Sequence, residues 1–539
     1  MATLMQALPF GLSSFELIRT GNAVFVDKTG LIPELAQIGA KIFLARPRRF
    51  GKSLLVSTLS SLFSHGLRHF RGLQIEKMWN DRTYPVVQLD FSALPEFYSA
   101  EQFRTAWLDL LAANFATVGF RYDRKSEVSF RQQFRLWLRS LPVSSLVILI
   151  DEYDAPLTRV INDERSFNEV RDQLNEFFRA LKECDGALRF FFMTGITKFS
   201  HTSIFSAFNN LYDISLDPQY GALLGWSEDE VKAYFGSYIE KASRILGMSE
   251  TQIVEGLRRN YDGFCFEQTG TVHVFCPWSV LHFLRSPGLG FQNYWYRSGG
   301  QPTVLKNFLK SHAISDPLKY DVPLALPLSD LQAPRQYDEL SLDVLLTQAG
   351  YLTIQSVRSD EVVFLGYPNE EVSVAFARLY SDELLHGKSI RGNVDSPAAD
   401  EVLASGTFAD VVSLFGDALN AIDYKDYPIK SEAHLRAYLQ ILLIGAAMVP
   451  EVEKHSALGR SDLELNAGCR RWVFELKYAE RERDVPNLLR KALDQLKERR
   501  YGEAPHGRRL LRAALVFSGD KRRFAAAEML NDEGSPKME

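Results

Sequence analysis

Short apolar runs alternate with amphipathic segments along the first two hundred residues. Residues 146–150 read Leu-Val-Ile-Leu-Ile, and such an unbroken run is typical of a parallel strand buried on both faces. Residues 41–45 and 188–193 are similar runs, whereas residues 53–63 and 167–181 carry apolar side chains at helical spacing. This alternation predicts a parallel α/β sheet.

A different pattern begins near Gly225. Ser227 and Glu230 have the spacing of a capping box, which predicts a helix start, and further helical segments follow. Residues 316–334 are rich in proline and residues 389–399 are polar, so both indicate connecting segments. We therefore expect a helical lid and a mixed middle region, neither of which carries identifiable chemistry.

The C-terminal part predicts a hairpin with charged residues on one face. Residues 461–465 and 471–478 alternate as strands around a short turn. The two-residue period of a strand places Glu475 and Lys477 on the same face, and the hairpin brings Asp462 close to them.

Two carboxylates and a lysine in this arrangement predict a metal site for phosphodiester hydrolysis. Asp462 and Glu475 would bind Mg²⁺, with Mn²⁺ as a substitute, and Lys477 would orient the nucleophile or neutralise charge on the phosphorus. Glu432, on an apolar helix upstream, is a further candidate metal ligand, and Gln495 lies on a helix downstream. The alternative is an ordinary exposed strand with paired charges.

A second candidate site follows the first apolar run. Residues 46–53 read Arg-Pro-Arg-Arg-Phe-Gly-Lys-Ser, which ends like the phosphate-binding pattern G-x-x-x-x-G-K-[ST], with Arg46 in place of the first glycine. Gly51 would let the backbone approach the phosphates, Lys52 would reach the β- and γ-phosphates, and Ser53 would bind Mg²⁺. The alternative is a basic loop with a solvated lysine. The nucleotide-binding residues expected in this segment are Arg46, Arg48, Arg49, Phe50, Gly51, Lys52, Ser53 and Leu54.

The long apolar run of residues 146–150 ends in Asp151 and Glu152, which is the Walker B layout. Asp151 would hold Mg²⁺ through water, and Glu152 would polarise the attacking water. Thr194, at the end of the next strand, is a candidate γ-phosphate sensor, as is Thr197; the alternative for either is a strand cap. Candidate residues for neutralising charge in the transition state are Arg46, Arg48, Arg49 and Lys198.

Composition narrows the setting without deciding the function. The net charge is −5, but residues 430–539 carry 21 Lys and Arg against 17 Asp and Glu, so this segment is the likelier place for DNA or RNA to bind. The four cysteines form no CxxC pair, which argues against a zinc knuckle and suits a reducing cytoplasm. We expect a cytoplasmic chain without a membrane span, because no apolar stretch approaches the ~20 residues that a span needs.

The chain resembles a prokaryotic family of AAA-ATPase-like proteins with a C-terminal PD-(D/E)XK nuclease-like domain. The resemblance covers nearly the whole length, and the family's phosphate loop also lacks the first glycine. The segments that carry it include residues 8–11, 25–29, 46–53, 151–154, 194–195, 198–200, 261–263, 276–279, 350–352 and 367–369. The Asp-x(n)-Glu-x-Lys order of Asp462, Glu475 and Lys477 matches the nuclease-like superfamily.

The residues and the resemblance together predict an α/β chain in four parts. The parts are a P-loop parallel-sheet domain, a helical lid, a helical or mixed connector and a restriction-endonuclease-like α/β domain, expected over residues 1–224, 225–285, 286–395 and 396–539. The resemblance implies an ATPase coupled to a Mg²⁺-dependent nuclease acting on DNA or RNA, in defence or mobile-element control. One alternative is an ATP-dependent switch whose C-terminal domain binds nucleic acid or protein without cleaving it, and another is an interaction scaffold. The resemblance to an AAA-like module also implies homo-oligomerisation.

Overall fold

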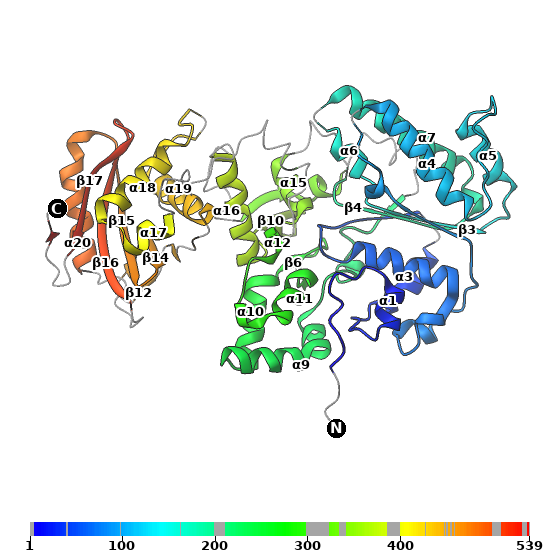
Figure 1. Cartoon of the computed structure of the whole chain (residues 1–539), viewed down its shortest axis with the longest axis horizontal. Coiled ribbons are helices and arrows are strands. Elements are labelled where there is room, and N and C mark those ends of the chain that lie inside the picture. The colour runs from blue at the N-terminus through cyan, green and yellow to red at the C-terminus, as the bar shows by residue number, and fades with distance from the viewer. Residues whose placement is uncertain are drawn as a thin grey trace. The chain divides into compact units, whose positions relative to one another are not determined.

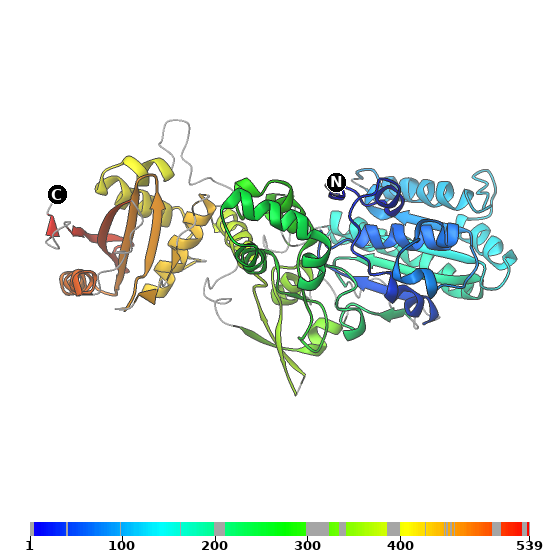
Figure 2. The ribbon, with the colours of Figure 1, turned by 90° about the horizontal axis from the view of Figure 1, so that it is seen from below.

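The computed structural model divides the chain into two compact units (Figures 1 and 2). Unit 1 comprises residues 1–308 and 323–373, and unit 2 comprises residues 309–322 and 374–539. The structure describes residues 5–38, 41–97, 99–161, 163–198, 211–297, 305, 323–333, 341–359, 361–384, 399–425, 427–446, 448, 451–452, 455–456, 459–498, 508–530 and 536–537. Residues 316–322 and 334 of the Pro-rich segment, residues 389–398 of the polar segment and residues 499–507 therefore lie outside the described residues.

Unit 1 is built on a five-stranded sheet in the order β2-β3-β4-β1-β5. All four pairings are parallel, as the buried apolar runs predict. Because β4 lies between β1 and β3, the ends of the phosphate-loop strand and of the acidic strand flank the end of β4. The strands are β1 (Lys41–Ala45), β2 (Val86–Asp90), β3 (Leu146–Asp151), β4 (Leu188–Gly195) and β5 (Leu211–Asp213).

Helices cover both faces of this sheet (Figure 1). Helices α1 (Phe15–Thr20) and α3 (Lys52–His65) lie on one face, and α4 (Ala100–Ala116), α5 (Phe130–Ser140) and α7 (Glu164–Glu183) lie on the other. Serine or aspartate side chains cap the first amides of α1, α4, α5 and α7, which fixes where these helices begin. Two shorter helices complete this part of the unit: α2 (Ile32–Gln37) and α6 (Ala155–Arg159).

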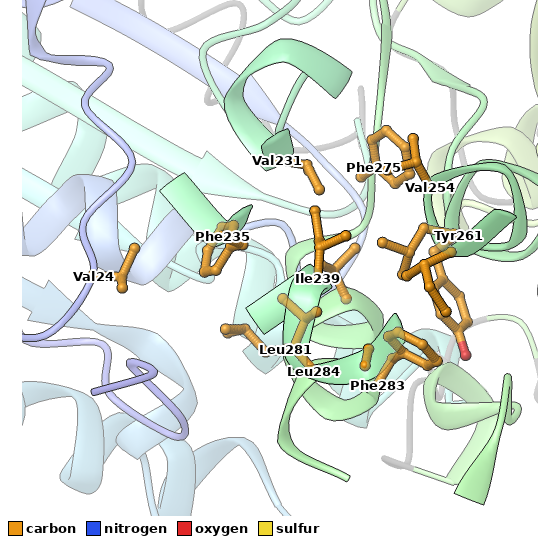
Figure 3. Packing of buried hydrophobic residues seen from close by; sticks show 14 of the residues in the cluster. Val24, Val231, Phe235, Ile239, Val254, Tyr261, Phe275, Leu281, Phe283 and Leu284 are labelled. Atoms are coloured by element: carbon orange, nitrogen blue, oxygen red, sulfur yellow. The ribbon is translucent and has the colours of Figure 1, made fainter. Parts of the chain in front are cut away.

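A helical subdomain follows the sheet, as the sequence predicts. Its helices are α9 (Glu228–Leu246), α10 (Glu250–Tyr261) and α11 (Pro277–Arg285), and both α9 and α10 begin with capping boxes. Their apolar side chains point toward one another in a shared core that also includes Val24 of the N-terminal segment (Figure 3). The N-terminal segment and this helical subdomain, which we call the lid, therefore share one hydrophobic core.

The rest of unit 1 is a small antiparallel sheet in the order β8-β10-β9 with its neighbouring helices. The hydroxyl of Thr353 in β9 accepts a hydrogen bond from the Cys265 amide and donates one to its carbonyl, which ties this sheet to β6. The elements are β6 (Phe264–Cys265), β7 (His273–Val274), α12 (Tyr294–Arg297), β8 (Leu324–Pro327), α14 (Leu328–Gln332), α15 (Leu342–Ala349), β9 (Thr353–Arg358) and β10 (Val362–Gly366).

Unit 2 contains a mixed sheet in the order β11-β14-β15-β16-β17-β18. Strand β14 forms the predicted antiparallel hairpin with β15, whereas β15 and β16 are parallel. Val473 of β15 packs against α20, and Trp472 and Phe474, which alternation turns the other way, contact α17 and α18. Both faces of the sheet are therefore covered.

The bounds of these elements are α16 (Glu370–Leu384), α17 (Ala399–Ser405), α18 (Phe408–Asn420), α19 (Glu432–Gly445), β11 (Glu451–Val452), β12 (His455–Ser456), β13 (Gly459–Arg460), β14 (Leu463–Ala467), β15 (Arg470–Ala479), α20 (Val485–Glu498), β16 (Arg509–Ser518), β17 (Arg523–Leu530) and β18 (Pro536–Lys537). The mixed α/β folds of both units confirm the predicted fold class. In the part of the chain that the structure describes, no helix combines the length and apolar character needed to cross a bilayer.

Candidate nucleotide and metal sites

The phosphate loop joins β1 to α3 through a backbone that glycine and local packing make possible. Gly51 has φ +97° and Arg49 has φ +75°, two left-handed conformations close together in a short loop. The aromatic ring of Phe50 anchors the loop, because it packs edge-on against Phe264 and Phe266 at centroid distances of 4.8 Å. Helix α3 therefore begins at Lys52 with its N-terminus, a favourable place for anions, directly after the loop.

The ammonium group of Lys52 lies inside this loop. Lys52 is 6% exposed, and its Nζ donates hydrogen bonds to the carbonyl oxygens of Arg46 and Pro47, both at 3.0 Å. Burial lowers the pKa of Lys52, although the nearby carboxylates of Asp151 and Glu152 oppose that effect. The loop thus holds a lysine that phosphate oxygens, as stronger acceptors, would draw away from the two carbonyls.

Asp151 and Glu152 lie at the end of β3, near the start of α3. The hydroxyl of Ser53 hydrogen-bonds to Asp151, but burial outweighs this bond and raises the pKa of the aspartate. Burial also raises the pKa of Glu152, a non-glycine residue with φ +48°. A strained backbone at the end of a strand is a feature of functional sites, so these observations fit the predicted site.

A cavity of about 530 Å³ opens over the phosphate loop. Residues 48–54 and Glu152 line it, together with the N-terminal segment and the lid. The sequence predicted a helical lid, with Trp278 among its packing residues, but gave no role to the N-terminal segment, although residues 25–29 are among the family motifs. The lining residues that sequence reasoning missed include Pro9, Gly11, Leu12, Ser13, Phe25, Val26, Lys28, Thr29, Leu223, Leu224, Trp226 and Leu281.

The side chains of two residues that the sequence predicted to contact the nucleotide, Arg46 and Thr194, bind backbone carbonyl groups instead. The guanidinium of Arg46 is buried, donates to the carbonyls of Ser215 (2.6 Å) and Tyr220 (3.1 Å), and lies over the ring of Phe266. Thr194 is fully buried and its hydroxyl donates to the Leu44 carbonyl at 2.9 Å. Because both side chains serve to hold strands and loops together, we place neither at the phosphates.

The other polar candidates near the end of β4 are also engaged. The hydroxyl of Thr197 and two backbone amides donate to one carboxylate oxygen of Asp154. Lys198 pairs with Asp213 at 2.8 Å. Of the proposed charge neutralisers, Arg48 and Arg49 therefore remain at the cavity.

The C-terminal candidates converge on one ammonium group. Lys477 Nζ lies 2.9 Å from Glu475, 3.2 Å from Glu432 and 3.9 Å from Asp462, measured to the nearest carboxylate oxygen in each case. The hairpin and the start of α19 thus bring together all four residues that the sequence selects. Arg436, which the sequence did not single out, lies 3.9 Å from Asp462.

Backbone groups and burial set the electrostatics of this cluster. The Leu476 amide donates to Asp462 Oδ2 at 2.8 Å and fixes that carboxylate beside β15. Burial and the neighbouring Asp462 raise the pKa of Glu475 to about 7. Burial also raises the pKa of Glu432, while the surrounding carboxylates raise the pKa of Lys477 despite its own burial.

The donor set fits a divalent cation. Oxygen ligands from carboxylates are what Mg²⁺ prefers, and Glu475 Oε2 is buried without a hydrogen-bond partner among the described residues. Among the described residues, no group of three or more His, Cys, Asp or Glu side chains is arranged as a metal site, and the Lys477 ammonium lies among the carboxylates of this cluster. Gln495 on α20 likewise has a buried side-chain oxygen that lacks a described partner.

The fold and the two sites define a class of protein in which a P-loop ATPase-like module is joined to a PD-(D/E)XK nuclease-like module. Residues 9–205 match the family described as "Predicted AAA-ATPase" (AAA-ATPase-like), and residues 430–526 match the PD-(D/E)XK nuclease superfamily. The chain is also 29% identical to an uncharacterized protein from the vnfD 5′ region of Azotobacter chroococcum mcd 1, over 96% of this chain and 97% of the relative. These matches confirm the predicted resemblance and support an ATPase and a nuclease-like function.

Proposed function

We propose that this chain binds and hydrolyses ATP in unit 1 and uses the nucleotide to control a Mg²⁺-dependent cut in DNA or RNA by unit 2. The observation that carries the proposal is the convergence of Glu432, Asp462 and Glu475 around Lys477. An exposed strand with paired charges would not gather three carboxylates and a lysine from separate elements at one point, nor bury Glu475 and Lys477 there. A role in defence or mobile-element control belongs to the same proposal and rests on the domain architecture.

In unit 1, the phosphate loop would hold the nucleotide. The amides at the start of α3 and the Lys52 ammonium would bind the phosphates, and Ser53 with Asp151 would hold the Mg²⁺. Glu152, whose pKa is raised by burial, would orient the attacking water from the edge of the cavity.

In unit 2, Asp462, Glu475 and Glu432 would hold the metal. A bound Mg²⁺ or Mn²⁺ supplies activation of water and stabilisation of charge on the phosphate. The Lys477 ammonium, released from its ion pairs as the carboxylates bind the metal, would orient the nucleophile or neutralise the phosphate. The Leu476 amide keeps Asp462 in place throughout.

The direct test is a cleavage assay on the full chain. Single- and double-stranded DNA and RNA are incubated with Mg²⁺ or Mn²⁺, with and without ATP, for the wild type, Glu475→Ala and Lys52→Ala. Glu480→Ala and Lys77→Ala are matched controls at exposed positions. We expect cleavage that Glu475→Ala abolishes, and an effect of ATP on cleavage that Lys52→Ala removes.

The alternative function is a nucleotide switch whose unit 2 binds without cutting. Ion pairing of Lys477 with all three carboxylates favours it, because the ammonium already lies among the oxygens that a metal would need. Absence of cleavage on every substrate, with ATP binding that still depends on Lys52, would replace the proposal with this alternative. If the wild-type chain does not bind ATP, both the proposed function and this alternative are contradicted.

A further inference from the structure

A buried carboxylate lies away from both sites and has no role in either. Glu371, near the start of α16, is 1% exposed. One of its oxygens accepts a hydrogen bond from the Ser279 hydroxyl at 2.6 Å, and the other accepts from the amides of Tyr294 (2.5 Å) and Trp295 (2.9 Å). Burying a carboxylate is costly even with three donors, so its presence calls for an explanation beyond packing.

The first partner of Glu371 leads to the phosphate loop. Ser279 lies in α11 directly after Trp278, whose ring lies 4.0 Å from the guanidinium carbon of Arg49. Both Trp278 and Arg49 line the nucleotide cavity. The Ser279–Glu371 hydrogen bond therefore holds the turn of α11 that stacks against the loop.

Trp295, another hydrogen-bond donor to Glu371, connects it to a different residue of the phosphate loop, Pro47. A Cβ atom on Gly350 would lie 2.8 Å from Cβ of Pro47 and 3.4 Å from the ring of Trp295. Trp295, whose amide donates to Glu371, therefore packs against Gly350, and Gly350 in turn lies against Pro47. The two branches from Glu371 reach the loop at Pro47 and Arg49.

Helix α16 itself belongs to both units. It runs from Glu370 to Leu384, and the division between the units falls inside it, after Ser373. A helix resists bending because each turn is hydrogen-bonded to the next. A displacement of its first turn is consequently passed on along its length.

We infer that Glu371 is a positioning residue that joins the phosphate loop to α16 and carries the nucleotide state of the loop to unit 2. This inference rests on the proposed binding of ATP at the loop, and it does not require that unit 2 cleaves. Phosphates that draw Arg49 toward themselves would release Trp278, and the change would reach α16 through Ser279 and Glu371.

Hydrogen exchange of the full chain, with and without ATP and Mg²⁺, tests the inference. In the wild type, we expect ATP to change exchange in residues 374–384 at least about threefold. In Ser279→Ala and Glu371→Gln, ATP affinity should stay within about threefold of the wild type, while the ATP-dependent change in residues 374–384 is lost. Glu370→Gln and Ser373→Ala, neighbours on α16 outside the hydrogen-bonded group, are the controls and should keep that change.

Each other outcome overturns the inference in a recognisable way. ATP binding to the wild type without a change in residues 374–384 would show that α16 does not respond to the nucleotide. A full response in both Ser279→Ala and Glu371→Gln would show that another route carries it. Absence of ATP binding in the folded wild type would contradict both the proposed function and this inference. Absence of nuclease activity would contradict only the proposed function.

Discussion

Lys477 shows how one cationic side chain can hold several neighbouring carboxylates together. Three carboxylates without a cation would repel one another, and burial would make that repulsion stronger. The ammonium offsets their charge in the metal-free chain, and the carboxylates in turn raise the pKa of the lysine. The same balance makes the cluster sensitive to pH near neutrality.

The first prediction concerns metal affinity and pH. Because the pKa of Glu475 is raised to about 7, a metal must displace a proton from this carboxyl at lower pH. We expect Mn²⁺ affinity, measured by isothermal titration calorimetry, to be about tenfold weaker at pH 6 than at pH 8. In Glu475→Gln, binding should be weaker and this dependence should shrink; equal wild-type affinities at the two pH values would contradict the assignment.

The second prediction concerns the stability contributed by Glu371. Burial raises its pKa to about 7, so between about pH 4.5 and pH 7 the folded chain holds a proton that the unfolded chain has released. This residue's contribution to the free energy of unfolding therefore falls as pH rises through that range. The neighbouring Tyr261 and Cys276 do not interfere, because burial raises the pKa of both and keeps them neutral there.

Urea unfolding at pH 5 and pH 8 measures this effect. We expect Glu371→Gln to gain up to about 3 kcal/mol relative to the wild type on going from pH 5 to pH 8. Glu370→Gln, which removes an exposed carboxylate on the same helix, should show less than about 0.5 kcal/mol of such change. Parallel behaviour of the two variants would mean that Glu371 titrates normally.

At the scale of elements, the ends of β3 and β4 are locked together by close packing. A Cβ atom on Gly195 would lie 2.5 Å from the ring of Tyr153, whose hydroxyl donates to the Thr197 carbonyl at 2.7 Å. Asp154 accepts three further hydrogen bonds from Ile196 and Thr197. The acidic residues at the end of β3 owe their position to this packing.

Gly195→Ala is therefore expected to destabilise unit 1. The ring of Tyr153 must move to admit the methyl group, at a cost of about 1–3 kcal/mol in the free energy of unfolding. Gly186→Ala is the matched control, since a Cβ there meets nothing within 4 Å. Denaturant titration of both variants measures the difference, and equal midpoints would show that the strand ends are less tightly packed than described.

The sequence predicted elements better than it predicted side-chain directions. Apolar runs and capping boxes give the parallel strands and the lid helices because burial and local hydrogen bonding act within a few residues. The position of Arg46 in the loop suggested a phosphate ligand. Only the fold shows that its guanidinium donates hydrogen bonds to the carbonyl oxygens of Ser215 and Tyr220 instead. Glu371 could not be found for the same reason, because its three donors are more than seventy residues away in the chain.

At the scale of the whole molecule, the two units should unfold in separate transitions, one of which belongs to the unit that binds ATP. We expect calorimetry to show two unfolding transitions, of which ATP with Mg²⁺ raises the one that belongs to unit 1. At one hundred times the dissociation constant, bound ATP adds about 2.7 kcal/mol to the stability of that unit. Lys52→Ala should abolish the shift while Lys77→Ala retains it; a shift of both transitions together would indicate one cooperative unit.

The division of the chain inside α16 also bears on how such proteins evolve. A recombination junction between Ser373 and Val374 would join two halves of one helix from different proteins, so the buried Val372 and Phe376 would meet unmatched partners. Gene fusion or exchange of one half at that point would rarely give a folded product, so the two halves are expected to be inherited as a pair. The relative from Azotobacter chroococcum, which aligns with 96% of this chain and over 97% of its own length, is consistent with such joint descent.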